Sequence, residues 1–197
     1  MTVRFIILAT VFIFFQNTIA DSFTNNTFNN HGSIGLINLP TARIYNESSF
    51  GITFYDGNPD QKITMTSSPY DWLEASFFYT NLKDVAYCEF EFDPVCDQDY
   101  KDKGFNFKIK LKEEGRLPAI AIGLNDIAGT GYYSSEYIVG SYGINNTDFH
   151  FGLGWGTLDG SDNKFKNPLG YLSDNFYDSP DYTEESGGQF QASRYFS

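Results

Sequence analysis

Apolar residues recur at every second position through much of the chain from Phe50 onward, and this alternation limits the fold more than any other feature. In one segment the apolar positions are Phe105, Phe107, Ile109 and Leu111, with polar residues between them. A period of two is the signature of β-strands whose two faces meet different surroundings. No stretch after residue 20 shows a convincing helical period. The sequence therefore predicts an all-β protein.

The alternating segments are centred near residues 50, 63, 76, 108, 121, 139, 152 and 192. A soluble sandwich would bury the apolar face of such strands, whereas a membrane β-barrel would turn it to lipid. The segments run to about 8 to 11 residues, close to the roughly 9–11 residues of a tilted transmembrane strand. Eight strands also make the smallest usual closed barrel. We therefore expect an antiparallel outer-membrane-type β-barrel, with a soluble sandwich as the alternative.

Aromatic and small residues favour the barrel. Aromatic side chains near strand ends are typical of interfacial girdles, and here they are Tyr55, Trp72, Tyr79, Tyr142 and Trp155. In the segment around residue 152 we expect one face to meet lipid and the other to line the lumen. The lipid-facing set is Phe149, Phe151, Leu153 and Trp155, and the lumen-facing set is His150, Gly152, Gly154 and Gly156.

The first twenty residues predict a secretory signal peptide. Arg4 supplies a positive charge, residues 5–15 are largely apolar, and Thr18-Ile19-Ala20 approximates a small-x-small cleavage site. The apolar run is too short for a helix that spans a bilayer, which takes about 20 residues. We expect cleavage after Ala20. No cysteine follows directly, so we do not expect a lipid anchor on the mature N-terminus.

Export changes how the two cysteines are interpreted. Cys88 and Cys96 are separated by a short loop, and an oxidising compartment favours a disulfide between them. Two free thiols are the alternative, and a metal site built on two cysteines alone is weaker still.

Composition excludes several classes of function. The 25 acidic and 13 basic residues give a formal charge of −12, which is unsuited to binding nucleic acid. Two cysteines and two histidines exclude Cys/His zinc sites, and we expect no metal and no cofactor. The G-x-S-x-G and H-E-x-x-H motifs are absent, so we identify no catalytic residues and expect a non-enzymatic protein. Strand carboxylates such as Glu74, Asp126 and Glu136 leave a glycosidase arrangement as the minor alternative.

Several strings in the sequence are specific. They are GSIGLINLPTARIY at residues 32–45, PAIAIGLNDIAGTG at residues 118–131 and GLGWG at residues 152–156. In order and wording they resemble the YjbH/GfcD family, and the likeness covers nearly the whole chain after the signal peptide. The resemblance implies an outer-membrane β-barrel that takes part in exopolysaccharide or capsule production and export. It implies outer-membrane lipid, polysaccharide and other exopolysaccharide secretion proteins as partners.

Two features depart from the family. Its members are usually much longer, so we expect this chain to be an N-terminal portion, with residues 1–20 as signal peptide, 21–47 as an N-terminal segment and 48–197 as an incomplete barrel domain. Some relatives are lipoproteins, whereas here the residue directly after Ala20 is Asp21 and not a cysteine. The alternative functions are a secreted or periplasmic glycan-binding β-domain and a general porin-like barrel.

Candidate ligand contacts follow from residue type alone. Aromatic faces suit sugar rings, which makes Trp72 and Trp155, together with Arg43, candidate contacts for polysaccharide. The alternative is that these residues serve packing and turns. Pro40 follows an apolar strip and fixes the backbone, so we expect the segment around it to turn into or across the barrel mouth.

Overall fold

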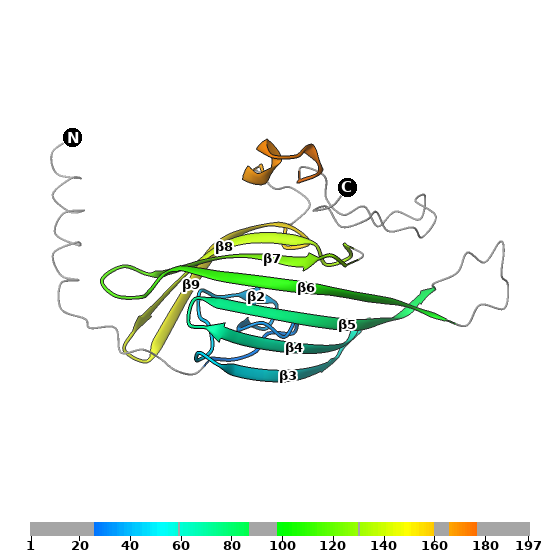
Figure 1. Ribbon diagram of the computed structural model, residues 1–197, viewed down its shortest axis with the longest axis horizontal. Coiled ribbons are helices and arrows are strands. Elements are labelled where there is room, and N and C mark those ends of the chain that lie inside the picture. The colour runs from blue at the N-terminus through cyan, green and yellow to red at the C-terminus, as the bar shows by residue number, and fades with distance from the viewer. Residues whose placement is uncertain (1–25, 59, 87–97, 130, 160–165, 177–197) are drawn as a thin grey trace.

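A computed structural model of the chain describes residues 26–58, 60–86, 98–129, 131–159 and 166–176. Seven strands form one sheet in sequence order, each antiparallel to its neighbours (Figure 1). They are β3 Ser49–Asp56, β4 Asp60–Tyr70, β5 Leu73–Ala86, β6 Asp99–Lys112, β7 Ala119–Ile127, β8 Ser135–Ile144 and β9 Thr147–Gly156. The prediction of an all-β, antiparallel chain is confirmed. The eighth predicted strand, around residue 192, lies outside the described residues.

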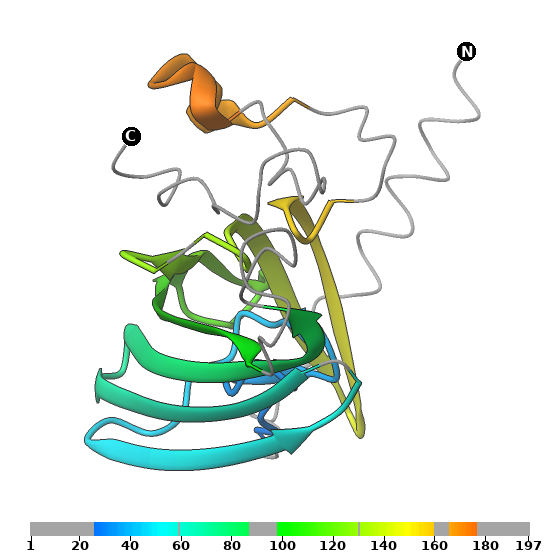
Figure 2. The same cartoon turned by 90° about the vertical axis from the view of Figure 1, so that its right-hand side faces the viewer.

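The sheet curls and has a concave and a convex face (Figure 2). Because successive side chains of a strand point to opposite faces, the alternation in sequence sorts them between the two. The concave positions are buried and are mainly polar or small. They include Thr64, Thr66, Glu74, Ser76, Thr80, Asn106, Lys108, Ala121 and Ser141.

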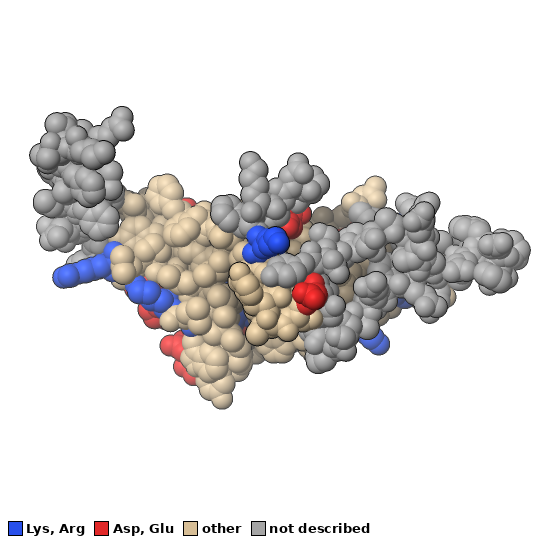
Figure 3. Space-filling model, turned by 90° about the horizontal axis from the view of Figure 1, so that it is seen from above, with Lys and Arg blue, Asp and Glu red and all other residues tan. Residues whose placement is uncertain are grey.

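The convex face is exposed and apolar. Its large exposed side chains include Phe50, Ile52, Phe54, Met65, Phe105, Phe107, Ile109, Leu111, Ile122, Ile138, Phe149, Phe151 and Leu153. Figure 3, a view from the top of Figure 1, shows few charged side chains on that side of the described structure. Soluble monomers rarely expose a continuous apolar surface of this extent, so the convex face is built to be covered by an apolar medium or by a partner.

The N-terminal segment, residues 26–45, lies inside the curl of the sheet (Figure 2). It contains a short hairpin of β1 Gly35–Leu36 and β2 Leu39–Pro40. Ile34 and Ala42 are almost completely buried, and Ala42 packs with residues of β7 and β8. From Pro40 we expected the segment to turn into or across the barrel mouth. It extends farther than that and lies across the concave face of the sheet.

A segment after β9 covers one end of the convex face. It carries two short 3-10 helices, η1 Pro168–Tyr171 and η2 Asp174–Phe176, and Asn167 before η1 donates to Glu136 Oε2 of β8 at 2.7 Å. Trp155 is the cross-strand partner of Glu136 and is only 8% exposed. The expectation that Trp155 faces lipid is therefore wrong, whereas the other apolar members of its strand are exposed on the convex face.

Tyr55 also departs from its expected place, since it points to the concave side and lines a cavity there instead of standing in a girdle. No helix among the described residues is long and apolar enough to cross a bilayer.

Candidate functional site

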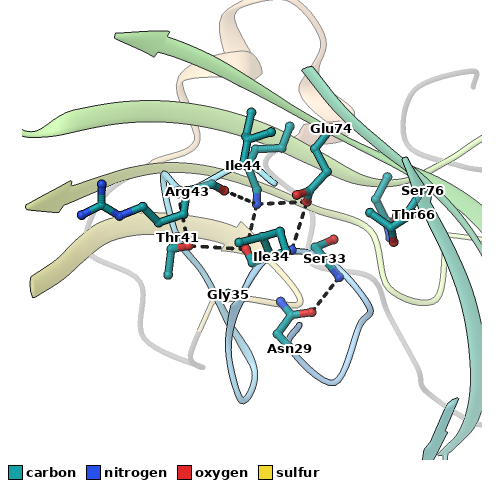
Figure 4. Close-up of polar contacts among 12 residues, drawn as sticks. Asn29, Ser33, Ile34, Gly35, Thr41, Arg43, Ile44, Thr66, Glu74 and Ser76 are labelled. Carbon is teal, nitrogen blue, oxygen red and sulfur yellow. Dashed lines mark hydrogen bonds and ion pairs between the residues drawn. The ribbon is translucent and has the colours of Figure 1, made fainter. Parts of the chain in front are cut away.

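A buried ion pair fastens the N-terminal segment to the wall of the sheet (Figure 4). Glu74 of β5 and Lys108 of β6 are cross-strand partners, and Glu74 Oε1 lies 3.0 Å from Lys108 Nζ with both side chains 2% exposed. The same Glu74 oxygen accepts from the backbone N–H of Ile34 at 3.1 Å. Lys108 Nζ donates to the carbonyl oxygens of Ile34 at 2.7 Å and Arg43 at 3.1 Å. The Lys108 ammonium is therefore satisfied by Glu74 and by the segment, whereas Glu74 Oε2 has no hydrogen-bond partner among the described residues.

Hydroxyl groups on other strands extend this attachment. Thr64 and Thr66 of β4 donate to the carbonyl oxygens of His31 and Gly32 at 3.2 and 2.5 Å. Across the interior, Ser141 of β8 accepts from the backbone N–H of Ala42 at 2.8 Å. Polar inward positions therefore pair with the backbone of the segment, which explains why a buried face can carry so many hydroxyl groups.

Gly32 makes this close approach possible. Its φ is +79°, which lies in the left-handed region that favours glycine, and a Cβ built there would stand 2.3 Å from Thr64 Cβ. The segment therefore meets β4 at a point where no side chain fits.

Arg43 closes the opposite end of the segment. Its guanidinium pairs with Glu114, in the connection between β6 and β7, and with Asp148 Oδ1 of β9 at 2.7 Å. His150 Nε2 lies 3.4 Å from Asp148, and His150 Nδ1 lies 2.8 Å from Ser141 Oγ. Arg43 is thus bound to two carboxylates of the protein itself.

A cavity of about 380 Å³ lies between the N-terminal segment, β4, β6 and the connection between β7 and β8. Lys62 and Asn106 belong to its wall, His31 comes from the N-terminal segment, and Tyr132 and Tyr133 come from the connection between β7 and β8. The volume falls within the range of roughly 300–1,000 Å³ that small-molecule sites occupy. It is the candidate ligand site.

Lys62 is the unusual group of this cavity, because its side chain is buried at 5% exposure. Its Nζ lies 3.5 Å from the centroid of the Tyr133 ring and 5.1 Å from that of Phe78. It also lies 3.3 Å from His31 Nδ1, and because an ammonium can only donate, this nitrogen of the imidazole is the acceptor.

The neighbours of Lys62 are held in neutral forms. Burial, and then the adjacent Lys62 charge, lower the pKa of His31 to about 4, so the imidazole is neutral near pH 7. Burial and the nearby Asp60 carboxylate raise the pKa of the Tyr133 phenol far above its usual value, so its hydroxyl keeps its proton. Both side chains can therefore act as neutral hydrogen-bonding groups at physiological pH.

The three candidate glycan contacts from the sequence are not brought together. Arg43 is engaged with Glu114 and Asp148. Trp72 is exposed at the β4–β5 turn and stacks on Tyr70, with ring centroids 5.4 Å apart. Trp155 is buried near the C-terminal end of β9. Ala20, Cys88 and Cys96 lie outside the described residues.

The carboxylates considered for a glycosidase have structural partners. Glu74 pairs with Lys108, Glu136 accepts from Asn167, and Asp126 Oδ2 accepts from the backbone N–H of Tyr133 at 3.0 Å. In the part of the chain that the structure describes, no cluster of three or more His, Cys, Asp or Glu side chains could hold a metal ion.

Sequence reasoning missed the cavity residues Lys62 and His31. Lys62 stands at an inward position of β4, two residues before Thr64 in a run of buried polar residues, and a lysine facing inward in a strand is the signal that could have identified it. Nothing in the sequence around His31 shows that it meets β4.

Comparison with known proteins completes the description of the chain. The family described as "Exopolysaccharide biosynthesis protein YbjH" matches residues 27–197. A curated relative, "Uncharacterized lipoprotein YjbH" of Escherichia coli (strain K12), is 36% identical over 166 residues, which are 84% of this chain. The chain spans 23% of that relative's length. No solved structure was found to match. The family match over most of the residues, together with this identity, shows that the chain belongs to the YjbH exopolysaccharide biosynthesis family.

Proposed function

We propose that the full-length protein is a non-enzymatic β-barrel component of the outer membrane that takes part in exopolysaccharide production and export. The observation that carries this proposal is the polarity of the curled sheet, whose convex face is apolar and exposed while its concave face is polar and buried. Transmembrane barrels have this arrangement, with an apolar band toward lipid and a polar interior. The seven strands would form part of a barrel wall that further strands complete.

The length of four of the seven strands agrees with this role, while β3 is shorter with 8 residues and β5 and β6 are longer with 14 each. β4 has 11 residues, β8 and β9 have 10 each, and β7 has 9, while a tilted strand needs roughly 9–11 residues to cross the hydrocarbon layer. Family membership supplies the link to exopolysaccharide, and the lipoprotein relative supports a place in the cell envelope. Outer-membrane lipid, polysaccharide and other secretion proteins are the partners that we propose.

The filled interior favours a polysaccharide-handling component over a general porin. The N-terminal segment bonds to β4, β5, β6 and β8 and so lies across the space that an open channel would need. A general porin would keep a water-filled channel there.

Fractionation of cells that make the full-length protein tests the membrane assignment. We expect the protein in the outer-membrane fraction, extracted only by detergent and migrating differently on gels before and after heating. Recovery in the soluble periplasmic fraction would contradict the proposal and would favour the glycan-binding β-domain.

Deletion of the full-length gene tests the role. We expect less or altered surface polysaccharide under producing conditions, restored when the gene is returned. Unchanged polysaccharide in the deletion strain would contradict the proposal.

A further inference from the structure

The ammonium of Lys62 is buried and has more N–H donors than acceptor atoms among the described residues. Within the described part of the chain its polar partner is His31 Nδ1 at 3.3 Å, and its other close contact is the Tyr133 ring at 3.5 Å. An ammonium carries three N–H donors, so two of them have no acceptor atom among the described residues. A buried donor without an acceptor is costly, and Lys62 lines a cavity in which a ligand could supply acceptors.

Aromatic rings stand around the same cavity. Tyr132 and Tyr133 both line it, with ring centroids 5.0 Å apart and planes inclined at 58°. The two rings come from one connection, and Lys62 Nζ lies over the face of the Tyr133 ring. A flat aromatic surface beside hydrogen-bonding groups suits a molecule that has apolar C–H faces and hydroxyl groups at its rim.

The charges around the cavity select against an anion. Asp60 lines the cavity with Lys62, and Asp102 and Asp126 are close enough to act on the charge of Lys62. Among the described lining residues Lys62 is the one cation, and the carboxylates of Asp60 and Asp102 alone outnumber it, so an anionic ligand would be repelled. Hydroxyl groups meet no such penalty, because each can accept from an ammonium and donate to a carboxylate.

We infer that this cavity binds one uncharged sugar unit of the polysaccharide, with a hydroxyl oxygen of the sugar accepting from Lys62 Nζ and the sugar ring lying beside the Tyr132 and Tyr133 side chains that line the cavity. The inference rests on the proposed function, which supplies the polysaccharide. It moves the sugar contact from the three residues suggested by the sequence to the space between the N-terminal segment and β4.

Calorimetric titration of the full-length protein in detergent tests this site. The probes are oligosaccharides released by partial hydrolysis of the exopolysaccharide from the same cells, separated by anion exchange into an uncharged and an acidic fraction. We expect the uncharged fraction to bind, and Lys62→Met to weaken binding at least tenfold. Lys101→Met is the matched control, because Lys101 is exposed on β6 near the same end of the sheet, and it should bind as the wild type does.

A second pair of variants isolates the aromatic contact. Tyr133→Phe keeps the ring and should retain most of the affinity, whereas Tyr133→Leu removes it and should lose about as much as Lys62→Met. Heat-modifiable migration of each variant verifies that it is folded. Equal loss in Tyr133→Phe and Tyr133→Leu would overturn the assignment of the ring.

The outcomes separate this inference from the proposed function. Binding that Lys62→Met leaves unchanged, binding of the acidic fraction alone, or no binding of either fraction would each overturn the sugar site. The membrane assignment and the deletion phenotype could still hold in all three cases. Recovery of the protein outside the outer membrane would instead contradict the proposed function itself.

Discussion

Glu74 and Lys108 face each other on β5 and β6, and their carboxylate and ammonium meet 3.0 Å apart inside the curled sheet. Each also bonds to the backbone of the N-terminal segment. A buried ion pair contributes little net stability by itself, but removal of one partner leaves an uncompensated charge. The pair therefore fixes where the segment sits more than it raises stability.

Glu74→Leu should lower the free energy of unfolding by about 3–5 kcal/mol, because Lys108 is then left without its counter-charge. Adding Lys108→Met should recover part of this loss, since both charges are then gone. Urea unfolding of the full-length protein in lipid vesicles, followed by tryptophan fluorescence, gives the values. Lys110→Met, which removes a partly exposed pair with Glu113, is the control at about 0–1 kcal/mol. A double variant no more stable than Glu74→Leu would contradict the prediction.

Phe151→Arg separates a lipid-facing position from a water-facing one. Phe151 is 60% exposed in the middle of β9. If lipid covers it, arginine should lower the free energy of unfolding by roughly 2–4 kcal/mol, while at an ordinary water-exposed site the change would stay within about 0.5 kcal/mol. Phe151→Leu keeps the side chain apolar and serves as the control, with a loss below about 1.5 kcal/mol. Equal stability of the two variants would show that this face meets water.

Gly32→Ala should loosen the N-terminal segment. The added Cβ meets Thr64, and the left-handed backbone costs a non-glycine residue about 1–3 kcal/mol. Hydrogen exchange of the amides of residues 29–44, measured by mass spectrometry, should become faster. Gly115→Ala is the matched control, since its Cβ would have nothing within 4 Å. Unchanged protection in Gly32→Ala would mean that this contact does not hold the segment.

His31 should make stability depend on pH. Its pKa is lowered to about 4 in the folded protein, against about 6.5 when unfolded, so the unfolded state binds more protons between these values. The contribution is fully present above about pH 6.5 and is lost as the pH falls toward 4, with a slope of at most about 1.4 kcal/mol per pH unit. Unfolding of the wild type and His31→Gln across this window should show a shallower decline for the variant. Parallel declines would contradict the assignment.

Alternation in the sequence was enough to predict the seven strands of the described sheet and which face of them is apolar. Phe105 and Phe107 are exposed while Asn106 and Lys108 are buried, as a period of two requires once one face is apolar. The pairing of Glu74 with Lys108 could not be predicted, because alternation fixes the face that each side chain takes but leaves several registers of β5 against β6 with the same faces.

The occupied interior was also beyond sequence reasoning. The hydrogen bond from Ala42 to Ser141 joins residues 99 positions apart, and neither residue type signals a partner at that distance. The exposure of Trp155 was predicted wrongly for a related reason. Alternation along β9 assigns Trp155 to the correct face of the sheet, but the segment around Asn167, which comes later in the chain, covers that face at Trp155.

The position of residues 26–45 also bears on the order in which the chain can fold. These residues precede every strand of the sheet, yet their partners lie on β4, β5, β6 and β8. The hairpins can form one after another from local contacts. The hydrogen bond between Ala42 and Ser141 can form only after β8 has joined the sheet. The N-terminal segment therefore comes before all seven strands in the chain but can be fixed in place only after β8 has formed. A substitution such as Ser141→Ala should therefore mainly speed unfolding and leave the folding rate nearly unchanged.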